Sequence, residues 1–207
     1  MSMMYEIAEP IPASLALIQA SMSRDDAERV ERAYRFARAA HNGQLRDEGT
    51  PFIEHPVRVA EILWQELGVR NADLIVAALN HDVIEDSEAV DEHLVASAFG
   101  EVVAKLVVDV TKISVPPEEK AARDRAYLDR LPDLPVDSRL LKLADRIDNL
   151  RSVLLADDLA KARRYLDVSQ DEFVPLATMT DPVALRLVIE ACDAIERMLR
   201  DLDGTRL

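Results

Sequence analysis

Apolar residues return every three or four positions through most of this chain, and that period constrains its fold more than any other feature. Such spacing places apolar side chains along one face of an α-helix, whereas a half-buried strand alternates them every second position. The first such stripe follows Ser23, whose pairing with Asp26 three positions later is typical of a helix N-terminus. Its members are Val30, Ala33, Tyr34, Ala37, Ala40 and His41. The sequence therefore predicts a helix that begins after Ser23 and closes at Gly43.

Later segments continue the helical pattern. The run from Ala72 to Leu79 is almost wholly apolar, and its alanines and helical neighbours favour helix over strand. An irregular start that contains Pro10 and Pro12 precedes the first helix. The other predicted helices cover residues 56–67, 91–99, 102–110, 118–130, 137–150 and 181–202.

No alternation of strands and helices appears, so we predict an all-α fold, a single multi-helix bundle of 207 residues. The five glycines lie outside the long apolar stripes, and aromatics reach only 4%. The formal charge of -14 argues against binding of extended nucleic acid, because the averaged surface repels a polyanion. No apolar run is long enough to cross a membrane, and no basic leader precedes Arg24. The single Cys192 resembles a small core residue, and we expect a soluble cytoplasmic protein.

Histidine and carboxylate carry the candidate chemistry, because glycine-rich phosphate loops, CxxC pairs and GxSxG elbows are absent. His81 and Asp82 end the apolar run at 72–79, where a divalent ion could share them if further ligands converge. His55 and Asp145, which interrupts an apolar stripe, would complete a mixed nitrogen and oxygen site. Taken singly, each side chain is better explained as hydrogen-bonded structure, and periodicity does not show that the four meet.

Several motifs resemble, in order and spacing, the HD-type hydrolase domain of RelA/SpoT homologues, which hydrolyse the alarmone (p)ppGpp. They are the segments 39–46, 49–56 and 77–86, Phe99-Gly100 with Val110-Thr111-Lys112, and Lys142-Leu143-Ala144-Asp145-Arg146 with Asn149-Leu150-Arg151. The resemblance predicts one HD-type hydrolase domain over residues 1–207, of the stand-alone small alarmone hydrolase type. Its motif-bearing core covers about 25–155, and 156–207 form a C-terminal helical extension that matches nothing we recognise and either packs on the bundle or forms a homo-oligomer contact.

The resemblance also implies a set of roles. His55, His81, Asp82 and Asp145 would be the metal ligands, with Mn²⁺ the usual ion of that family. The reaction would release pyrophosphate from the 3′ position of the substrate and leave GDP or GTP. The other implied residues are Glu85 and Asp86 as catalytic acid/base groups, with Glu85 the stronger candidate, and Arg46 and Asn149 as substrate-binding groups.

Other polar residues are expected to be structural. Lys142 and Arg146 are interpreted chiefly as surface charges of their helix, His41 as a hydrogen-bonding support of its loop, and His93 as exposed.

Departures from the family pattern bear on the substrate. Asp47 stands where a basic residue commonly follows Arg46, and Glu48 comes next, so the attraction for a highly anionic nucleotide should be weaker. Asn80 replaces an apolar residue and Asp148 replaces an aromatic residue or histidine. Two alternatives therefore stay open: a phosphohydrolase for another nucleotide such as NADPH, and a module that binds the alarmone without cleaving it.

Overall fold

The computed structural model describes residues 10–156 and 158–204, and across these ranges the fold is all-α, as predicted. No strand forms in the described part of the chain, where Leu45 and Pro51 make an isolated antiparallel bridge. No helix among the described residues is long and apolar enough to cross a membrane.

The N-terminal helices follow the predicted pattern closely. Ser23 caps α2, since its hydroxyl oxygen accepts a hydrogen bond from the backbone N–H of Asp26 at 3.2 Å. The segment with Pro12 differs from the expectation of an irregular start: it begins a short helix whose Leu15 and Ile18 are buried. The elements are α1 (Ala13–Gln19), α2 (Arg24–Ala40), α3 (Glu54–Glu61), the π-helical turn η1 (Ile62–Glu66), α4 (Ala72–Asn80) and α5 (Val83–Asp86).

The all-apolar run is confirmed as helix α4, and it is buried on every side. Leu74, Ile75 and Leu79 are among the most deeply buried side chains, because α2, α3, α7 and α9 all contact this helix. A helix that is apolar all round needs such complete cover. The elements that follow are α6 (Glu92–Phe99), α7 (Glu101–Val110), the 3₁₀ turn η2 (Pro117–Glu119), α8 (Lys120–Arg130), the 3₁₀ turn η3 (Leu131–Asp133) and α9 (Val136–Val153).

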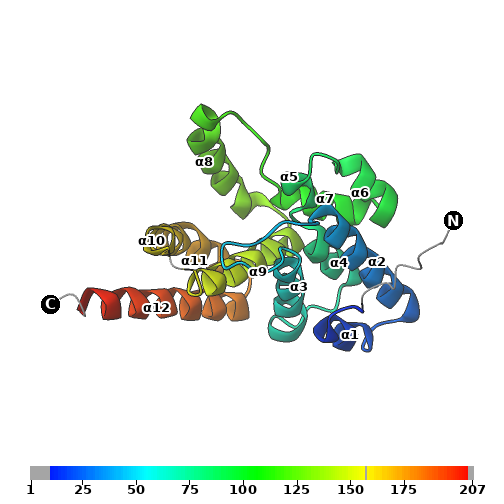
Figure 1. Ribbon diagram of the computed structural model, residues 1–207, viewed down its shortest axis with the longest axis horizontal. Helices are drawn as coiled ribbons and strands as arrows, with labels where there is room; N and C mark the ends of the chain where they lie inside the picture. Colours follow the sequence, from blue (N-terminus) through cyan, green and yellow to red (C-terminus); the bar gives the residue numbers. More distant parts are fainter. Residues whose placement is uncertain (1–9, 157, 205–207) are drawn as a thin grey trace.

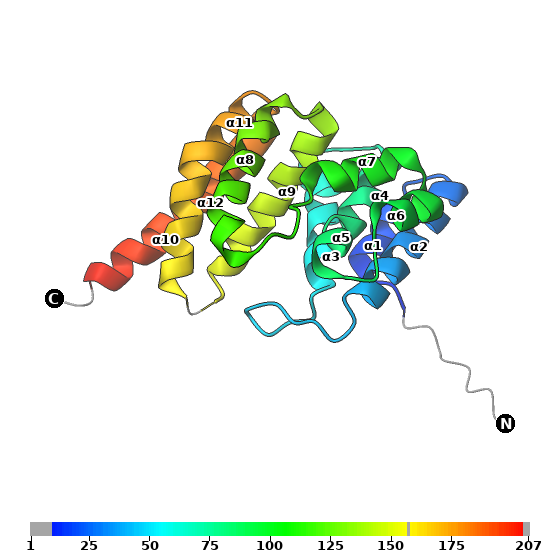
Figure 2. The same ribbon diagram turned by 90° about the horizontal axis from the view of Figure 1, so that it is seen from above.

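Helix α9 forms the centre of the molecule. Figures 1 and 2 both show it between the N-terminal helices and the C-terminal helices, and it contacts α3, α4, α7, α10 and α12. Its Leu141, Leu143, Ile147 and Leu150 are fully buried. The middle of this helix therefore lies between the two groups of helices.

The C-terminal segment packs on the bundle. Its elements are α10 (Leu159–Val168), the π-helical turn η4 (Ser169–Phe173), α11 (Val174–Thr178) and α12 (Pro182–Gly204). Helix α12 lies against α9, and Cys192 is buried in this contact region as a small core residue.

Candidate metal centre and adjoining pocket

Helix ends and the middle of α9 supply the four predicted ligands. His55 is the second residue of α3, His81 and Asp82 join α4 to α5, and Asp145 lies halfway along α9. The loop before α3 is held by two hydrogen bonds, from Arg46 N–H to the Thr50 carbonyl and from Gly49 N–H to the Arg46 carbonyl, both 2.9 Å. Gly49 has φ of 85°, a left-handed conformation that favours glycine.

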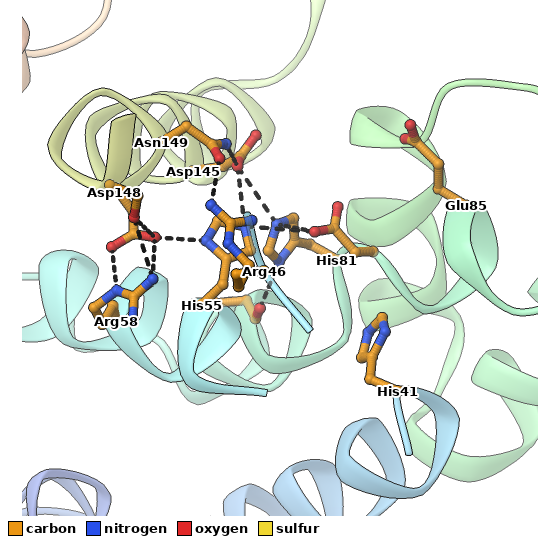
Figure 3. A network of polar contacts seen from close by, with 12 residues as sticks. His41, Arg46, His55, Arg58, His81, Glu85, Asp145, Asp148 and Asn149 are labelled. Atoms are coloured by element: carbon orange, nitrogen blue, oxygen red, sulfur yellow. Dashed lines mark hydrogen bonds and ion pairs between the residues drawn. The ribbon is translucent and has the colours of Figure 1, made fainter. Parts of the chain in front are cut away.

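The structure brings these four side chains together. His55 Nε2 lies 3.4 Å from Asp82 Oδ2 and 3.3 Å from Asp145 Oδ1. His81 Nε2 lies 3.2 Å and 3.7 Å from the same two oxygens. Both imidazoles are 1% exposed, and Figure 3 shows them facing Asp145. Residues 90 positions apart in sequence thus converge on one point.

The donor set fits a divalent cation. Ligand atoms in neighbouring positions around an ion, at about 2.1 Å from it, are about 3 Å apart, close to the contacts seen here. His81 Nε2 is buried and has no hydrogen-bond partner among the described residues. A buried polar atom without a partner is unfavourable unless something else satisfies it. Imidazole nitrogens together with carboxylate oxygens suit Mn²⁺, Fe²⁺ or Zn²⁺.

Each imidazole is oriented through its other nitrogen. His81 Nδ1 donates to the Ala78 carbonyl at 2.8 Å, and His55 Nδ1 contacts Asp148 Oδ2 at 2.6 Å. With Nδ1 engaged in this way, Nε2 of each ring is directed at the other ligands. Such partners fix the tautomer and ring orientation of metal-binding histidines.

The pKa values of the cluster are set by two opposing effects: burial, which disfavours charge, and the pairing of the imidazoles with the carboxylates, which favours it. Burial opposes charge on His55, but hydrogen bonds with Asp145, Asp148 and Asp82 raise its pKa to about 9. Burial also opposes charge on His81, yet Asp82 and Asp145 hold its pKa well above the usual value. The pKa values of Asp82 and Asp145 lie well below the usual value because, despite burial, neighbouring His81 and Lys142 favour the carboxylates. Protons therefore bind these imidazoles readily, and a metal ion must displace them in order to bind.

The two candidate acid/base residues lie beyond the ligands on the short helix α5. Glu85 Oε2 accepts a hydrogen bond from the Lys112 backbone N–H at 3.1 Å, and Figure 3 shows Glu85 apart from the imidazoles. The pKa of Asp86 is raised to about 6 by burial and by the nearby charges of Asp82 and Glu85.

A pocket of about 230 Å³ adjoins the cluster, with Asp145 and Asn149 in its wall. Asn149 donates to Asp145 Oδ1, and its own side-chain oxygen accepts from Arg46 at 2.9 Å. The Arg46 guanidinium also lies 5.6 Å from the centre of the Phe52 ring. Four cationic side chains line this pocket: Lys112, Lys142, Arg146 and Arg164.

The expectation that Lys142 and Arg146 are ordinary surface charges is wrong. Lys142 Nζ pairs with Asp145 Oδ2 at 2.7 Å, and its side chain is 11% exposed. Arg146 lies 4.5 Å from the ring centre of Tyr165 and 4.6 Å from that of Phe173. Both cations line the pocket because other helices cover this face of α9: the ring centre of Tyr127 on α8 lies 5.2 Å from Lys142 Nζ, and the C-terminal segment covers Arg146. The local pattern of α9 does not reveal this cover.

His41 and His93 agree with their expected roles. His41 contacts the Gln44 side-chain oxygen through Nδ1 at 2.8 Å and stacks on Phe52, so it supports its loop. His93 is exposed.

Sequence reasoning missed the roles of Arg58 and Asp148. The Arg58 guanidinium donates to both carboxylate oxygens of Asp148, at 2.6 and 3.1 Å, as Figure 3 shows. One signal was available: Asp145, Asp148 and Asn149 are three and four positions apart, which places them on one helical face. Arg58 had no local signal.

The residues that depart from the family pattern form ion pairs or hydrogen bonds with other residues of this chain. Asp47 pairs with Lys161, and Glu48 lies 3.7 Å from Arg46 and 3.6 Å from Arg58. Asn80 is fully buried and donates to the Val76 carbonyl at 2.8 Å.

An all-α bundle in which two helix ends and the middle of a central helix bring two histidines and two aspartates together is typical of an HD-type metal-binding domain. A profile described as HD domain matches residues 33–181, and the chain belongs to this family. Within it, the chain is similar to proteins named for alarmone chemistry. The guanosine-3′,5′-bis(diphosphate) 3′-pyrophosphohydrolase MESH1 of Danio rerio is 40% identical over 120 residues, which are 57% of this chain and 65% of that protein.

A second relative and a solved structure are also named for (p)ppGpp chemistry. The bifunctional (p)ppGpp synthase/hydrolase SpoT of Escherichia coli K12 is 38% identical over 166 residues, 78% of this chain and 23% of that protein. This chain spans less than two thirds of the length of either curated relative. The structure described as a metazoan ortholog of SpoT that hydrolyzes ppGpp matches with a TM-score of 0.69 and 25% identity, covering 89% of this chain and 96% of that one.

Proposed function

We propose that this protein is a metal-dependent (p)ppGpp 3′-pyrophosphohydrolase. The observation that carries the proposal is the convergence of His55, His81, Asp82 and Asp145 beside a pocket lined by cations. The names of the relatives support the same reaction. We further propose that the ion is Mn²⁺ and that the protein acts in the cytoplasm on a small nucleotide. The extent of the domain over residues 1–207 and any self-association stay predictions.

The four ligands would hold one divalent ion, which when bound lowers the pKa of a water molecule and withdraws charge from a phosphate oxygen. Arg46 would stack its planar guanidinium on the guanine base, and the hydrogen bond with Asn149 would keep that plane fixed. Lys112, Lys142 and Arg146 would balance the charge of the pyrophosphate in the pocket. These contacts orient the 3′-pyrophosphate toward the ligand cluster.

Glu85 would take the proton of the attacking water as the water oxygen bonds to phosphorus. The bond from the 3′-oxygen to phosphorus then breaks, and the 3′-oxygen takes up a proton, so that GDP or GTP and pyrophosphate leave. Asp86, whose pKa of about 6 lies near neutral pH, would assist in moving that proton.

The experiment follows pyrophosphate while purified protein is incubated with ppGpp and Mn²⁺. Glu85→Gln should lower kcat about 10²- to 10⁴-fold with metal content unchanged, because only proton transfer is removed. Glu88→Gln, an exposed carboxylate nearby, is the control and should keep the wild-type rate. Metal-loaded protein that releases no pyrophosphate would refute the proposal, and turnover of NADPH instead would favour the alternative substrate.

A further inference from the structure

Three residues outside the predicted ligand set form a continuous chain of contacts ending at a metal ligand. Glu48 Oε1 lies 3.6 Å from an Arg58 nitrogen, and Arg58 donates two hydrogen bonds to Asp148. Asp148 then contacts His55 Nδ1 at 2.6 Å. The side chains of Glu48 and Asp148 are 9% and 3% exposed, so water screens these contacts weakly.

The paired geometry restricts the Asp148 carboxylate. An arginine that contacts both oxygens of a carboxylate fixes its plane as well as its position. Asp148 Oδ2 accepts from Arg58 and contacts His55, and Ser152 contributes a weaker contact at 3.5 Å. A carboxylate held in this way keeps the proton of His55 on Nδ1 and leaves Nε2 facing Asp82 and Asp145.

We infer that Glu48, Arg58 and Asp148 are positioning residues that orient His55 for the cation and connect it to the Arg46 loop. The inference rests on the proposed function. It also gives Asp148, which departs from the family pattern, and Glu48, which follows the departure at Asp47, a common partner. Arg58 contacts both carboxylates, and Glu54 at 3.7 Å is a third.

The contacts close into a ring that includes the proposed nucleotide-binding residues. Glu48 also lies 3.7 Å from Arg46, which donates to Asn149, which in turn donates to Asp145. Asp145 lies 3.3 Å from His55, where the ring closes. A displacement of the Arg46 loop is therefore transmitted to two metal ligands by two routes. Glu48, although it touches no ligand, should influence metal affinity.

The test measures Mn²⁺ affinity directly, by calorimetric titration of the metal-free full chain with Mn²⁺ alone, and compares affinities that are corrected for the protons released on binding. Asp148→Asn keeps the side-chain shape but removes the charge, and it should weaken Mn²⁺ binding about 10- to 100-fold. Arg58→Gln should act in the same direction. Glu48→Gln should weaken binding about three- to tenfold. The thermal midpoint of each metal-free variant is recorded in parallel.

Arg29→Gln is the matched control, because the side chain of Arg29 is about as exposed as that of Arg58 and pairs with Asp73 on α4. Its charge interacts with Asp73 and Asp26, which are not among the tested residues or the predicted metal ligands. This variant should change the thermal midpoint without changing Mn²⁺ affinity. A purely structural role for the three residues predicts that same pattern for all of them, and affinities within twofold of wild type would overturn the inference.

The experiment also distinguishes misfolding of a variant from failure of the wild-type protein to bind the metal. Failure of Asp148→Asn to fold leaves the decision to Arg58→Gln and Glu48→Gln, whose residues are less central to the core. Failure of the wild-type protein to bind Mn²⁺ refutes the proposed Mn²⁺-dependent function, whereas wild-type binding with unchanged variants refutes only the positioning role.

Discussion

The affinity of the site for Mn²⁺ should rise steeply with pH, well above the range in which ordinary histidines titrate. The perturbation is a pH series from 6.5 to 8.5 applied to metal-free protein. Asp145, Asp148 and Asp82 overcome the effect of burial and raise the pKa of His55 to about 9, so this imidazole carries a proton at neutral pH. The cation must displace that proton, because a protonated nitrogen has no lone pair to donate.

The structure sets the size of the effect. At pH 7 the pKa of His55 lies about two units above the solution pH, which corresponds to about 3 kcal/mol or a 100-fold reduction in apparent affinity. Affinity should therefore increase about tenfold per pH unit and level off near pH 9. His81, whose pKa also lies well above the usual value, would make the rise steeper.

The assay is anaerobic calorimetric titration with Mn²⁺ in buffers of different ionisation enthalpy, which counts the protons released. At least one proton should leave per ion at pH 7. Asp148→Asn should shift the rise to lower pH, since one of the groups that raise the pKa of His55 loses its charge. The same variant should reach a lower affinity at the plateau, where no proton competes, because His55 is less well oriented. An affinity that is constant across the series, with no proton release, would refute this account of the site.

Three other changes test separate parts of the structure. His81→Ala should lose metal and activity together, and metal analysis that finds a full equivalent would contradict its place among the ligands. Arg46→Ala should raise KM for ppGpp by about 10-fold or more while leaving Mn²⁺ content near one equivalent, and steady-state kinetics would show whether the loss falls on kcat instead. Leu143→Ala, at a fully buried position of α9, should lower the free energy of unfolding by about 2–5 kcal/mol in chemical denaturation, and a loss below about 1 kcal/mol would argue against close packing there.

Local sequence patterns were sufficient for most of the helices. The cap at Ser23 and the apolar period of α9 each depend on residues within a few positions of one another. The short helix α1 was missed because prolines at 10 and 12 suggest irregular structure, although Pro12 directly precedes the first helical turn.

The candidate site was harder to predict from local patterns, because its contacts join distant parts of the chain. His55 and Asp148 are 93 positions apart, and only the packing of α3 against α9 brings them together. Resemblance to a family predicted the four ligands, but it could not point to Arg58 or Asp148 as partners, since neither belongs to the shared motif. The burial of Arg146 was equally hidden, because it depends on Tyr165 and Phe173 in a segment without a recognised motif.

That placement of Arg146 has a consequence for how this protein would choose among ligands. Arg146 projects from α9, and its guanidinium packs against the rings of Tyr165 and Phe173 in the C-terminal segment. Tyr165, Val168 and Phe173 also line the pocket directly. Discrimination between one nucleotide and another would thus depend on side chains of α10 and η4 as well as on the metal ligands. Two chains with identical metal-binding motifs could therefore accept different substrates.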